Sequence, residues 1–322
     1  MKGNRAAARG ATPTAPREPL RYDGRVVLVT GAGRGIGHAV AELLAARGAR
    51  LVVHNRRAVE YEVDPAGERA AAIRARGGEA IAVHGDVADP GTARRLVEAA
   101  LAQWGRLDAV VMNAGRIASR AVAELEESEL ERLYVVNALS AFRLTRAALP
   151  ALRRAGAGRL VYTTSTAGLF GGAGLAAYGM AKAALLALMR AVAEEEHGHG
   201  VLANAICPTA ATRMTEAFVE DAAMREALSP AAVAPAVAWL ASDACTVRGR
   251  VVLASGGLFR SAHVLQSDGV DLRAEAPIGP EHLVASSEAI LAASGLHDPA
   301  DAGAHFGAVI DALRASPPRD VD

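Results

Sequence analysis

The chain has few cysteines and no excess of charge of either sign. Cys207 and Cys245 are its two cysteines, too few for a disulfide framework and not spaced as metal ligands. We therefore predict no metal site and expect a reducing compartment, the cytoplasm. Lys plus Arg and Asp plus Glu number 35 each, so the charge balance predicts neither a nucleic acid nor a membrane partner.

Long hydrophobic runs are also lacking. No stretch approaches the roughly 18 unbroken apolar residues of a membrane span. Residues 1–20 contain scattered Arg, Ala and Pro in place of the apolar core of a secretory signal. An Arg-rich start with few acidic residues also fits a transit peptide, but its Gly and Pro content favours a disordered tail. The whole chain is 51% hydrophobic, which is ample for a core.

From Arg25 onward, short β-branched runs alternate with longer segments of helical periodicity. Several of the short runs are apolar on successive residues, as strands are when a parallel sheet buries both of their faces. The predicted strands are Val26–Val29, Leu51–His54, Ala80–His84, Ala109–Met112, Leu160–Thr163, Leu202–Ile206 and Val251–Ala254. The predicted helices are Gly37–Arg47, Pro65–Arg76, Pro90–Trp104, Glu126–Arg154, Ala177–His197 and Pro230–Ala241.

This alternation predicts an α/β fold with a doubly wound, Rossmann-type parallel sheet and helices on both faces. No linker interrupts residues 21–257, so we expect one domain that ends at Gly256 and Gly257. Residues 258–322 form an extended C-terminal tail with two weak helical patterns, Pro280–Ala293 and Ala302–Ala315. We expect this tail to pack on the core or on a neighbouring subunit.

A glycine motif, Thr30-Gly-Ala-Gly-Arg-Gly-Ile-Gly37, lies between the first predicted strand and the first predicted helix. Gly31 permits a tight turn, Gly35 lets the backbone approach a pyrophosphate, and Gly37 lets the helix pack closely on the strand. The helix N-terminus then offers free amides to the phosphates. An ordinary Gly-rich turn is the alternative, and the flanking strand and helix make it the weaker one.

Residues after the next strands predict how a dinucleotide would be held. Asn55 stands where a carboxylate usually binds the adenosine ribose, so a 2′-phosphate is not repelled, and Arg56 or Arg34 can pair with it. This favours NADP(H) over NAD(H), unless these arginines form only a solvated basic loop. Asp86 is placed to accept a hydrogen bond from the adenine amino group. Asn113-Ala114-Gly115 closes the fourth strand, and turn formation explains Asn113 nearly as well.

Three polar residues downstream predict proton-transfer chemistry. Tyr178 and Lys182 lie four positions apart, so they share one face of a helix. An ammonium nearby stabilises phenolate, so we expect Lys182 to lower the pKa of Tyr178. Ser165 follows the fifth strand and is placed to bind the same substrate oxygen. A surface Tyr–Lys contact is the alternative, and it does not account for Ser165 or the glycine motif.

Together these motifs resemble the short-chain dehydrogenase/reductase family from about Gly24 to Gly257. The resemblance rests on the glycine motif, Asn113-Ala-Gly115, Val136-Asn137, Ser165, Tyr178-Gly-Met-Ala-Lys182 and Cys207-Pro208. It implies that Tyr178 is the acid/base, that Ser165 orients the substrate oxygen, and that Lys182 holds the nicotinamide ribose. Asn137 would anchor a proton-relaying water. The implied cofactor-binding residues are Gly31, Gly33, Arg34, Gly35, Ile36, Gly37, Asn55, Arg56, Asp86, Val87, Asn113, Ala114, Gly115, Tyr178, Lys182, Pro208 and Thr212.

The chain departs from the family pattern at three positions. Thr209 follows Pro208 where Gly is usual, Ser140 occupies a usual Gly position, and Asn55 replaces the acidic residue. None of these positions is one of the four implied catalytic residues, Asn137, Ser165, Tyr178 and Lys182. The departures therefore bear on cofactor choice and substrate fit. Thr212 lies in the family's cofactor-covering loop. Residues 217–228 look like either an apolar lid or an amphipathic helix packed on the core.

Thr166-Ala-Gly-Leu-Phe-Gly171 and the C-terminal extension are similar to the dehydrogenase units of multifunctional β-oxidation enzymes. This likeness implies a 3-oxoacyl or 3-hydroxyacyl thioester, or a polyketide-like substrate. We expect an oxidoreductase that interconverts a small-molecule ketone and a secondary alcohol with NADP(H), or alternatively NAD(H). Family precedent implies a homodimer or homotetramer through Glu126–Arg154 and Ala177–His197. The rival hypotheses are an NADPH sensor without activity and an epimerase or dehydratase with an internal redox cycle.

Overall fold

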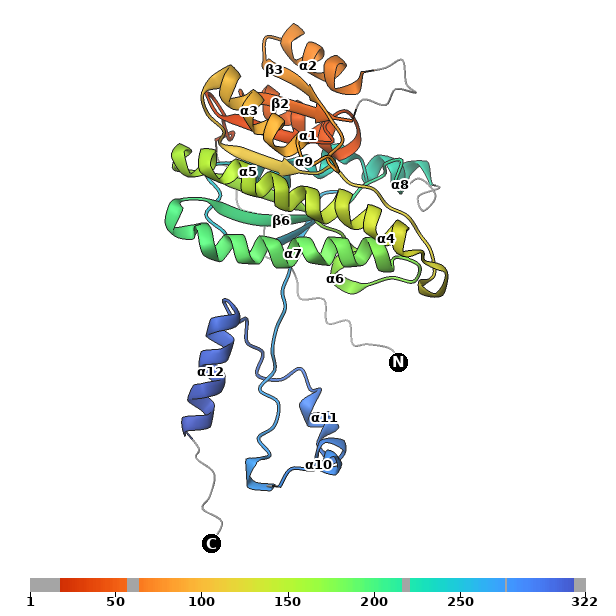
Figure 1. The fold of residues 1–322 in the computed structure, drawn as a ribbon, viewed down its shortest axis with the longest axis vertical. Coiled ribbons are helices and arrows are strands. Elements are labelled where there is room, and N and C mark those ends of the chain that lie inside the picture. The colour runs from red at the N-terminus through yellow and green to blue at the C-terminus, as the bar shows by residue number, and fades with distance from the viewer. Residues whose placement is uncertain (1–17, 57–63, 216–220, 276, 316–322) are drawn as a thin grey trace.

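A computed structural model describes residues 18–56, 64–215, 221–275 and 277–315 (Figure 1). Its centre is an eight-stranded sheet in the order β3-β2-β1-β4-β5-β6-β7-β8. The strands are parallel except β8, which pairs antiparallel to β7. They are β1 (Val26–Thr30), β2 (Arg50–Asn55), β3 (Glu79–His84), β4 (Ala109–Met112), β5 (Arg159–Thr163), β6 (Leu202–Thr209), β7 (Val251–Ser255) and β8 (Leu258–Ala262).

Helices connect the strands and cover both faces of the sheet (Figure 1). The α-helices are α1 (Gly35–Ala46), α2 (Pro65–Ala75), α3 (Thr92–Trp104), α4 (Glu127–Tyr134), α5 (Ser140–Ala155), α6 (Thr166–Phe170), α7 (Ala176–Glu196), α8 (Ala222–Ala227), α9 (Ala234–Ala241), α10 (Pro280–Ala285), α11 (Ser287–Ile290) and α12 (Ala302–Ala315). Short helical turns are η1 (Val122–Glu124), η2 (Val135–Leu139), η3 (His197–His199), η5 (Pro230–Ala232) and η6 (Arg273–Glu275).

Two apolar clusters, one on each side of the sheet, form the core. One cluster joins α1, α2 and α9 to the strands, with Val40, Leu44 and Ile73 among its members. The other joins α3, α5 and α7, with Leu96, Leu152 and Met189 among its members. Strands β1, β4 and β5 are buried along their whole length. The fold is therefore the predicted α/β arrangement, a mostly parallel sheet between two helix layers.

Helix α7 with η3, Ala176–His199, is long and apolar enough to cross a membrane by length and composition. Its apolar residues are explained by packing, because Ala181, Leu185 and Met189 are buried inside the domain. No group of His, Cys, Asp or Glu side chains suited to a metal ion occurs among the described residues.

The segment predicted as one helix, Glu126–Arg154, differs from the prediction in its middle. Between α4 and α5 the helix widens into a π-turn, η2, which contains Asn137. Such wide turns arise where a helix accommodates an extra residue, often at functional sites. The segment predicted over Pro280–Ala293 is likewise divided, into α10 and α11, and the short helix α6 was not predicted.

The sheet does not end at Gly257 as expected. Gly256 and Gly257 both have positive φ, 52° and 85°, and they form a two-residue turn between Ser255 and Leu258, which are paired. Two glycines in this conformation are typical of a tight hairpin. Strand β8 therefore extends the domain beyond the predicted boundary.

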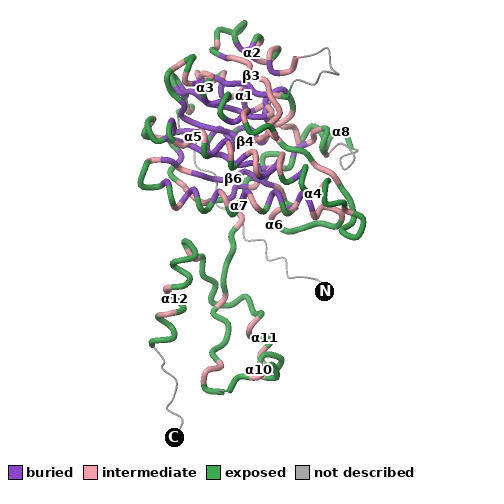
Figure 2. Tube along the Cα trace, in the orientation of Figure 1, coloured by how far each residue is buried: buried purple, intermediate pink, exposed green. Residues whose placement is uncertain are grey.

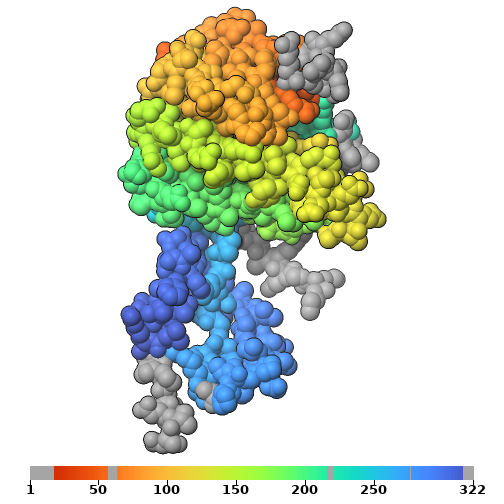
Figure 3. Space-filling model, in the orientation of Figure 1, coloured from red at the N-terminus to blue at the C-terminus, as the bar shows by residue number. Residues whose placement is uncertain are grey.

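After β8 the chain leaves the domain, and α10, α11 and α12 lie apart from it (Figures 1 and 3). Most of this tail is exposed (Figure 2). An ion pair between Arg250 and Asp298, at 2.7 Å, ties it to the domain. The tail thus does not cover the core, contrary to the first of the two expected arrangements, and many of its apolar residues are exposed. These include Val264, Leu265, Ile278, Leu283, Val284, Leu291, Leu296, Phe306, Val309 and Leu313.

Two sequence-based expectations fall partly outside the described residues. The N-terminal tail, residues 1–20, is described only from residue 18. The segment interpreted as a lid or a packed helix, 217–228, is described only from Asp221, which caps α8. No residue of α8 is buried, so this part of the segment is not a helix packed into the core.

Candidate active site

The strand order reverses between β1 and β4, whose connections leave in opposite directions. In doubly wound sheets such a point opens a crevice at the carboxyl ends of the strands, where ligands bind. Asn113, which follows β4, closes the bottom of this crevice: its Nδ2 donates to Thr30 O at 3.0 Å. Its backbone N–H and that of Ala114 both donate to Thr30 Oγ1. Asn113 therefore fixes the glycine turn to β4.

Two glycines of the turn, Gly33 and Gly37, have no space for a side chain. A Cβ on Gly37 would lie 2.4 Å from Gly31 O, and one on Gly33 would lie 2.8 Å from Asn55 Nδ2. Gly31 has a φ of 68°, a conformation that other residues rarely adopt. The N-cap of α1, Arg34, makes no side-chain cap hydrogen bond, so the first-turn amides are free for an anion. This cradle fits a dinucleotide pyrophosphate.

The residues predicted to discriminate the ribose lie at the end of β2. Asn55 is half-buried against Gly33, whereas Arg34 and Arg56 are exposed. Arg56 Nη1 lies 3.7 Å from Asp86 Oδ2, and Asp86 Oδ1 accepts a hydrogen bond from Ala88 N–H at 2.9 Å. Arg56 is therefore partly engaged by Asp86. Arg34 has no hydrogen-bond or ion-pair partner for its guanidinium among the described residues.

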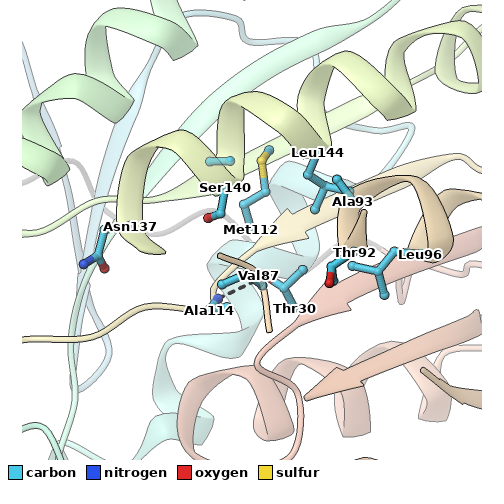
Figure 4. Close-up of a pocket in the computed structure, with 11 residues that line it drawn as sticks. Thr30, Val87, Thr92, Ala93, Leu96, Met112, Ala114, Asn137, Ser140 and Leu144 are labelled. Atoms are coloured by element: carbon cyan, nitrogen blue, oxygen red, sulfur yellow. Dashed lines mark hydrogen bonds between the residues drawn. The ribbon is translucent and has the colours of Figure 1, made fainter. Parts of the chain in front are cut away.

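A hollow lies beside the glycine turn, between β1, β4, α3 and the start of α5 (Figure 4). Val87, Ala114 and Asn137, all predicted site residues, line it. Its apolar wall was not predicted, because those residues occupy ordinary core positions of β4, α3 and α5. The wall residues include Ala93, Leu96, Met112 and Leu144.

Ser165, Tyr178 and Lys182 meet beyond the carboxyl end of β5. Ser165 is the N-cap of α6, where its Oγ accepts from Ala167 N–H at 3.2 Å, and it lies close enough to the Tyr178 phenol to lower the pKa of that group. Tyr178 is 7% exposed and Lys182 is 3% exposed. Lys182 Nζ donates to Thr163 O at 2.8 Å and lies 5.7 Å from the centre of the Tyr178 ring. The fold thus brings the three side chains predicted from spacing together, with Tyr178 and Lys182 buried and Ser165 partly buried.

The pKa of Tyr178 differs from the expectation. Burial raises it above its ordinary value, and the nearby Ser165 hydroxyl only partly opposes this. Burial also lowers the pKa of Lys182 to about 8. We expected the ammonium to lower the pKa of the phenol. Removal from water penalises the charged form of both groups, and Lys182 is not among the causes that shift the pKa of Tyr178.

Asn137, which is 2% exposed, is held by the wide turn of η2 with its side chain across the crevice. Its Nδ2 donates to Leu133 O at 3.0 Å and to Arg116 O at 2.8 Å. Its Oδ1 accepts from Arg116 N–H at 3.1 Å. A Cβ on Gly115 would meet both Asn137 Oδ1, at 2.7 Å, and Lys182 Nζ, at 3.4 Å. The amide therefore positions the 115–116 backbone next to Lys182.

Pro208 and Thr212 follow the core of β6. Pro208 lies in β6, opposite Ala254 of β7. Thr212 Cγ2 would be 3.6 Å from a Cβ on Gly35, so its loop lies over the glycine turn. Its Oγ1 accepts from Met214 N–H at 3.2 Å, an internal bond that shapes the loop. Cys207 is fully buried, and burial raises the pKa of its thiol to about 11.

Some residues that build the site were not predicted. Thr163 holds Lys182 through a backbone carbonyl, which leaves no trace in side-chain type. Gly168 lets α6 approach α7, because a Cβ there would lie 2.7 Å from the Lys182 carbonyl carbon. His54 is 2% exposed, and its Nε2 contacts Gly85 O at 2.9 Å. Burial lowers its pKa, so it joins β2 to the end of β3 as a neutral group.

Comparison with known families and proteins gives a consistent result. The sequence profile of the short chain dehydrogenase family matches residues 25–223. Peroxisomal multifunctional enzyme type 2 of Drosophila melanogaster is 37% identical over 259 residues, which are 79% of this chain and 42% of that protein. The mouse protein of the same name is 33% identical over 92% of this chain and 40% of its own length. The chain therefore spans about two fifths of these relatives.

The solved structures that resemble this chain include proteins of the same kinds as its sequence relatives. Full-length peroxisomal multifunctional enzyme type 2 from Drosophila melanogaster superposes on 92% of this chain and 50% of that one, with a TM-score of 0.77 and 29% identity. A short chain dehydrogenase from Mycobacterium avium superposes on 84% of this chain and 95% of that one, with a TM-score of 0.73 and 35% identity.

Proposed function

The chain belongs to the short chain dehydrogenase family, and from this premise we propose that it interconverts a ketone and a secondary alcohol. One observation carries the proposal. A buried phenol, Tyr178, lies beside Ser165 and next to the Lys182 ammonium, at the end of the crevice that contains the glycine cradle. A phenol so placed can give a proton to a substrate oxygen, or take it back, without exchange with bulk water.

Each residue has a separate task in this scheme. When bound, a nicotinamide cofactor supplies the hydride for reduction and accepts it in oxidation. Ser165 donates a hydrogen bond that holds the substrate oxygen, while Tyr178 transfers its hydroxyl proton to that oxygen. Lys182, held by Thr163 O, keeps two N–H donors for ribose hydroxyls. Asn137 fixes the backbone at Gly115 and Arg116, so that the site keeps its shape.

We propose NADP(H) as the preferred cofactor, with NAD(H) as the alternative. Asn55 places no negative charge against Gly33, so a 2′-phosphate meets no repulsion there. Arg34 is exposed at the start of α1 and is the better placed cation, since Arg56 is shared with Asp86. Paired guanidinium and phosphate groups form strong, directional contacts.

A 3-oxoacyl or 3-hydroxyacyl thioester is the proposed substrate class. The support comes from the relatives, since several are multifunctional enzymes. A peroxisomal hydratase-dehydrogenase-epimerase of Saccharomyces cerevisiae, for example, is 32% identical over 78% of this chain and 28% of its own length. Hydration of an enoyl thioester gives a hydroxyacyl thioester, the alcohol that a dehydrogenase would oxidise. We further propose a homodimer or homotetramer through the exposed faces of α5 and α7, where Phe142 is 43% exposed.

Replacement of Tyr178 by Phe tests the proposed chemistry. The variant keeps the ring and its packing but has no proton to transfer, so we expect turnover of acetoacetyl-CoA with NADPH to fall by at least about a hundredfold. The dissociation constant for NADPH, measured by fluorescence, should change less than threefold, since the glycine cradle is untouched. Turnover at the wild-type rate would refute the role of Tyr178. Retained activity without net NADPH oxidation would favour an epimerase or dehydratase.

A further inference from the structure

Arg116 stands at the edge of the site on a backbone that cannot move freely. Its N–H donates to Asn137 Oδ1 at 3.1 Å and its carbonyl accepts from Asn137 Nδ2 at 2.8 Å. The preceding residue, Gly115, lies between Asn137 Oδ1 and Lys182 Nζ. A side chain at position 116 therefore starts at a fixed point beside the catalytic lysine.

The guanidinium of Arg116 has no partner within the described part of the chain. The residue is exposed, and no hydrogen bond or ion pair of its side chain occurs among the described residues. Its neighbour Arg120 differs, since Arg120 Nε bonds to Glu129 at 3.0 Å. A cation held at a fixed place without a counter-ion is available to a ligand.

Three segments near the site contain no acidic residue, although the next helix, α4, supplies Glu129 to Arg120. Residues 113–120, 165–178 and 207–215 contain three arginines, Arg116, Arg120 and Arg213, and no Asp or Glu. The first two segments lie side by side, because Arg120 N–H donates to Gly174 O at 2.8 Å. The chain as a whole is neutral, with 35 residues of each sign, so this local excess does not reflect overall composition. Because Arg120 is paired with Glu129, Arg116 is the cation of residues 113–120 that is left to attract an anion.

We propose that Arg116 determines substrate specificity by binding an anionic group of the ketone substrate. This rests on the proposed function and adds to it that the substrate carries a negative charge. The charge has two potential sources, the phosphates of a thioester carrier or a carboxylate on the ketone itself. The cradle for the cofactor phosphates is a separate place, formed by Gly31 to Gly37 at the start of α1. Arg116 lies at a different point of the site, after the end of β4, where its backbone bonds to the Asn137 side chain.

The test compares charged and neutral substrates with Arg116→Gln. With NADPH, we expect the KM for acetoacetyl-CoA or for acetoacetate to rise about tenfold. The KM for the neutral acetoacetyl N-acetylcysteamine thioester should change less than twofold. Arg116→Lys should recover part of the loss, because it keeps the charge without the planar fork. Arg94→Gln is the matched control, since the Arg94 side chain is 78% exposed on α3 and is paired with Glu98 of the same helix.

Binding without turnover separates this inference from the proposed reaction. Coenzyme A and acetoacetate are titrated by calorimetry into protein saturated with NADP+. If Arg116→Gln weakens either ligand about tenfold and Arg94→Gln does not, the inference stands, even if no ketone is reduced, and the affected ligand identifies the source of the charge. The inference is overturned if wild-type protein binds neither ligand, if Arg116→Gln binds both as tightly as wild type, or if only its affinity for NADPH falls.

Discussion

At the scale of single residues, the site keeps two ionisable side chains away from water. Tyr178 and Lys182 are both nearly inaccessible to solvent, and burial favours the uncharged form of each. The lysine keeps one backbone acceptor, Thr163 O, and two donors without a partner among the described residues. Unpaired buried donors cost free energy. The site is therefore prepared for a ligand with hydroxyl acceptors, at some expense in stability.

The depressed pKa of Lys182 predicts a pH-dependent stability. Its pKa is about 8 in the folded protein, against an ordinary value of 10.5 for an exposed lysine, so the folded chain binds this proton less tightly than the unfolded chain. The penalty is complete below pH 8 and is relieved between pH 8 and 10.5. Lys182→Met has no such penalty, so its free energy of unfolding should exceed that of wild type at low pH. We expect this difference to fall by about 3 kcal/mol between pH 8 and 10.5. Urea unfolding of both proteins at several pH values measures it, and a constant difference would contradict it.

Asn55 predicts a change of cofactor preference. In Asn55→Asp a carboxylate would stand against the glycine turn, where a 2′-phosphate is proposed to bind. We expect the ratio of kcat/KM for NADPH to that for NADH to fall by roughly tenfold or more, because the carboxylate would repel the 2′-phosphate of NADPH. Asn55→Ser, which adds no charge, serves as the control. An unchanged ratio in Asn55→Asp would place the discrimination elsewhere.

At the scale of elements, α5 and α7 are joined by a bidentate ion pair. Arg153 Nε and Nη2 bond to the two oxygens of Glu196 at 2.7 and 2.5 Å. The Glu196 side chain is 2% exposed, whereas that of Arg153 is 46% exposed. The hydrogen bonds from Arg153 lower the pKa of Glu196. The pair holds the far end of the helix whose first turns carry Tyr178 and Lys182.

Removal of Arg153 predicts a loss of stability at neutral pH. Arg153→Met leaves a buried carboxylate without its partner, so we expect the free energy of unfolding to fall, by less than for a fully buried pair because the arginine is half-exposed. Because the folded pKa of Glu196 is lowered, its stabilisation is present above about pH 4.5 and is lost as the pH falls through the folded value. Chemical unfolding at pH 7 and pH 4 measures both effects. Adding Glu196→Gln should restore most of the loss, and an additive double variant would speak against the pair.

Periodicity and spacing predicted most elements of the domain, for physical reasons. Strands such as β1 and β4 are buried on both faces and are therefore apolar throughout. Ser165, Tyr178 and Lys182 meet because one follows a strand end and two share a helix face. Strand β8 was missed because the Gly256–Gly257 hairpin was interpreted as the end of the domain, and because β8 is mostly exposed. The backbone partners of Asn137 and Lys182 have no side-chain signature, so no sequence pattern could show them.

At the scale of the whole molecule, a folded domain carries an exposed tail (Figures 2 and 3). The tail has its own contacts, such as the pairing of Gln266 with His297 and the hydrogen bond from Arg273 to Ala312 O at 3.2 Å. It has no buried apolar core among its described residues. Apolar surface of this extent usually marks an interaction site.

A chain truncated after Val264 tests how far the stability of the domain depends on the tail. The Arg250–Asp298 pair is lost, and exposed pairs contribute at most about 1 kcal/mol. We therefore expect the melting temperature to change by no more than about 4 °C, measured by circular dichroism. Light scattering of both chains then shows whether the tail contributes to self-association. A truncated domain that fails to fold would contradict the separation of domain and tail.

The π-turn at η2 has a consequence for how this helix can change. At Val135–Leu139 the helix accommodates one extra residue. Deletion of a single residue can remove such an insertion. Deleting one residue here would yield a regular helix with more ideal backbone geometry. It would also turn the Asn137 amide away from the loop that it braces. The π-turn is thus the arrangement that keeps the Asn137 amide on the 115–116 backbone, and variants selected only for thermal resistance would be drawn toward the regular helix that loses this contact.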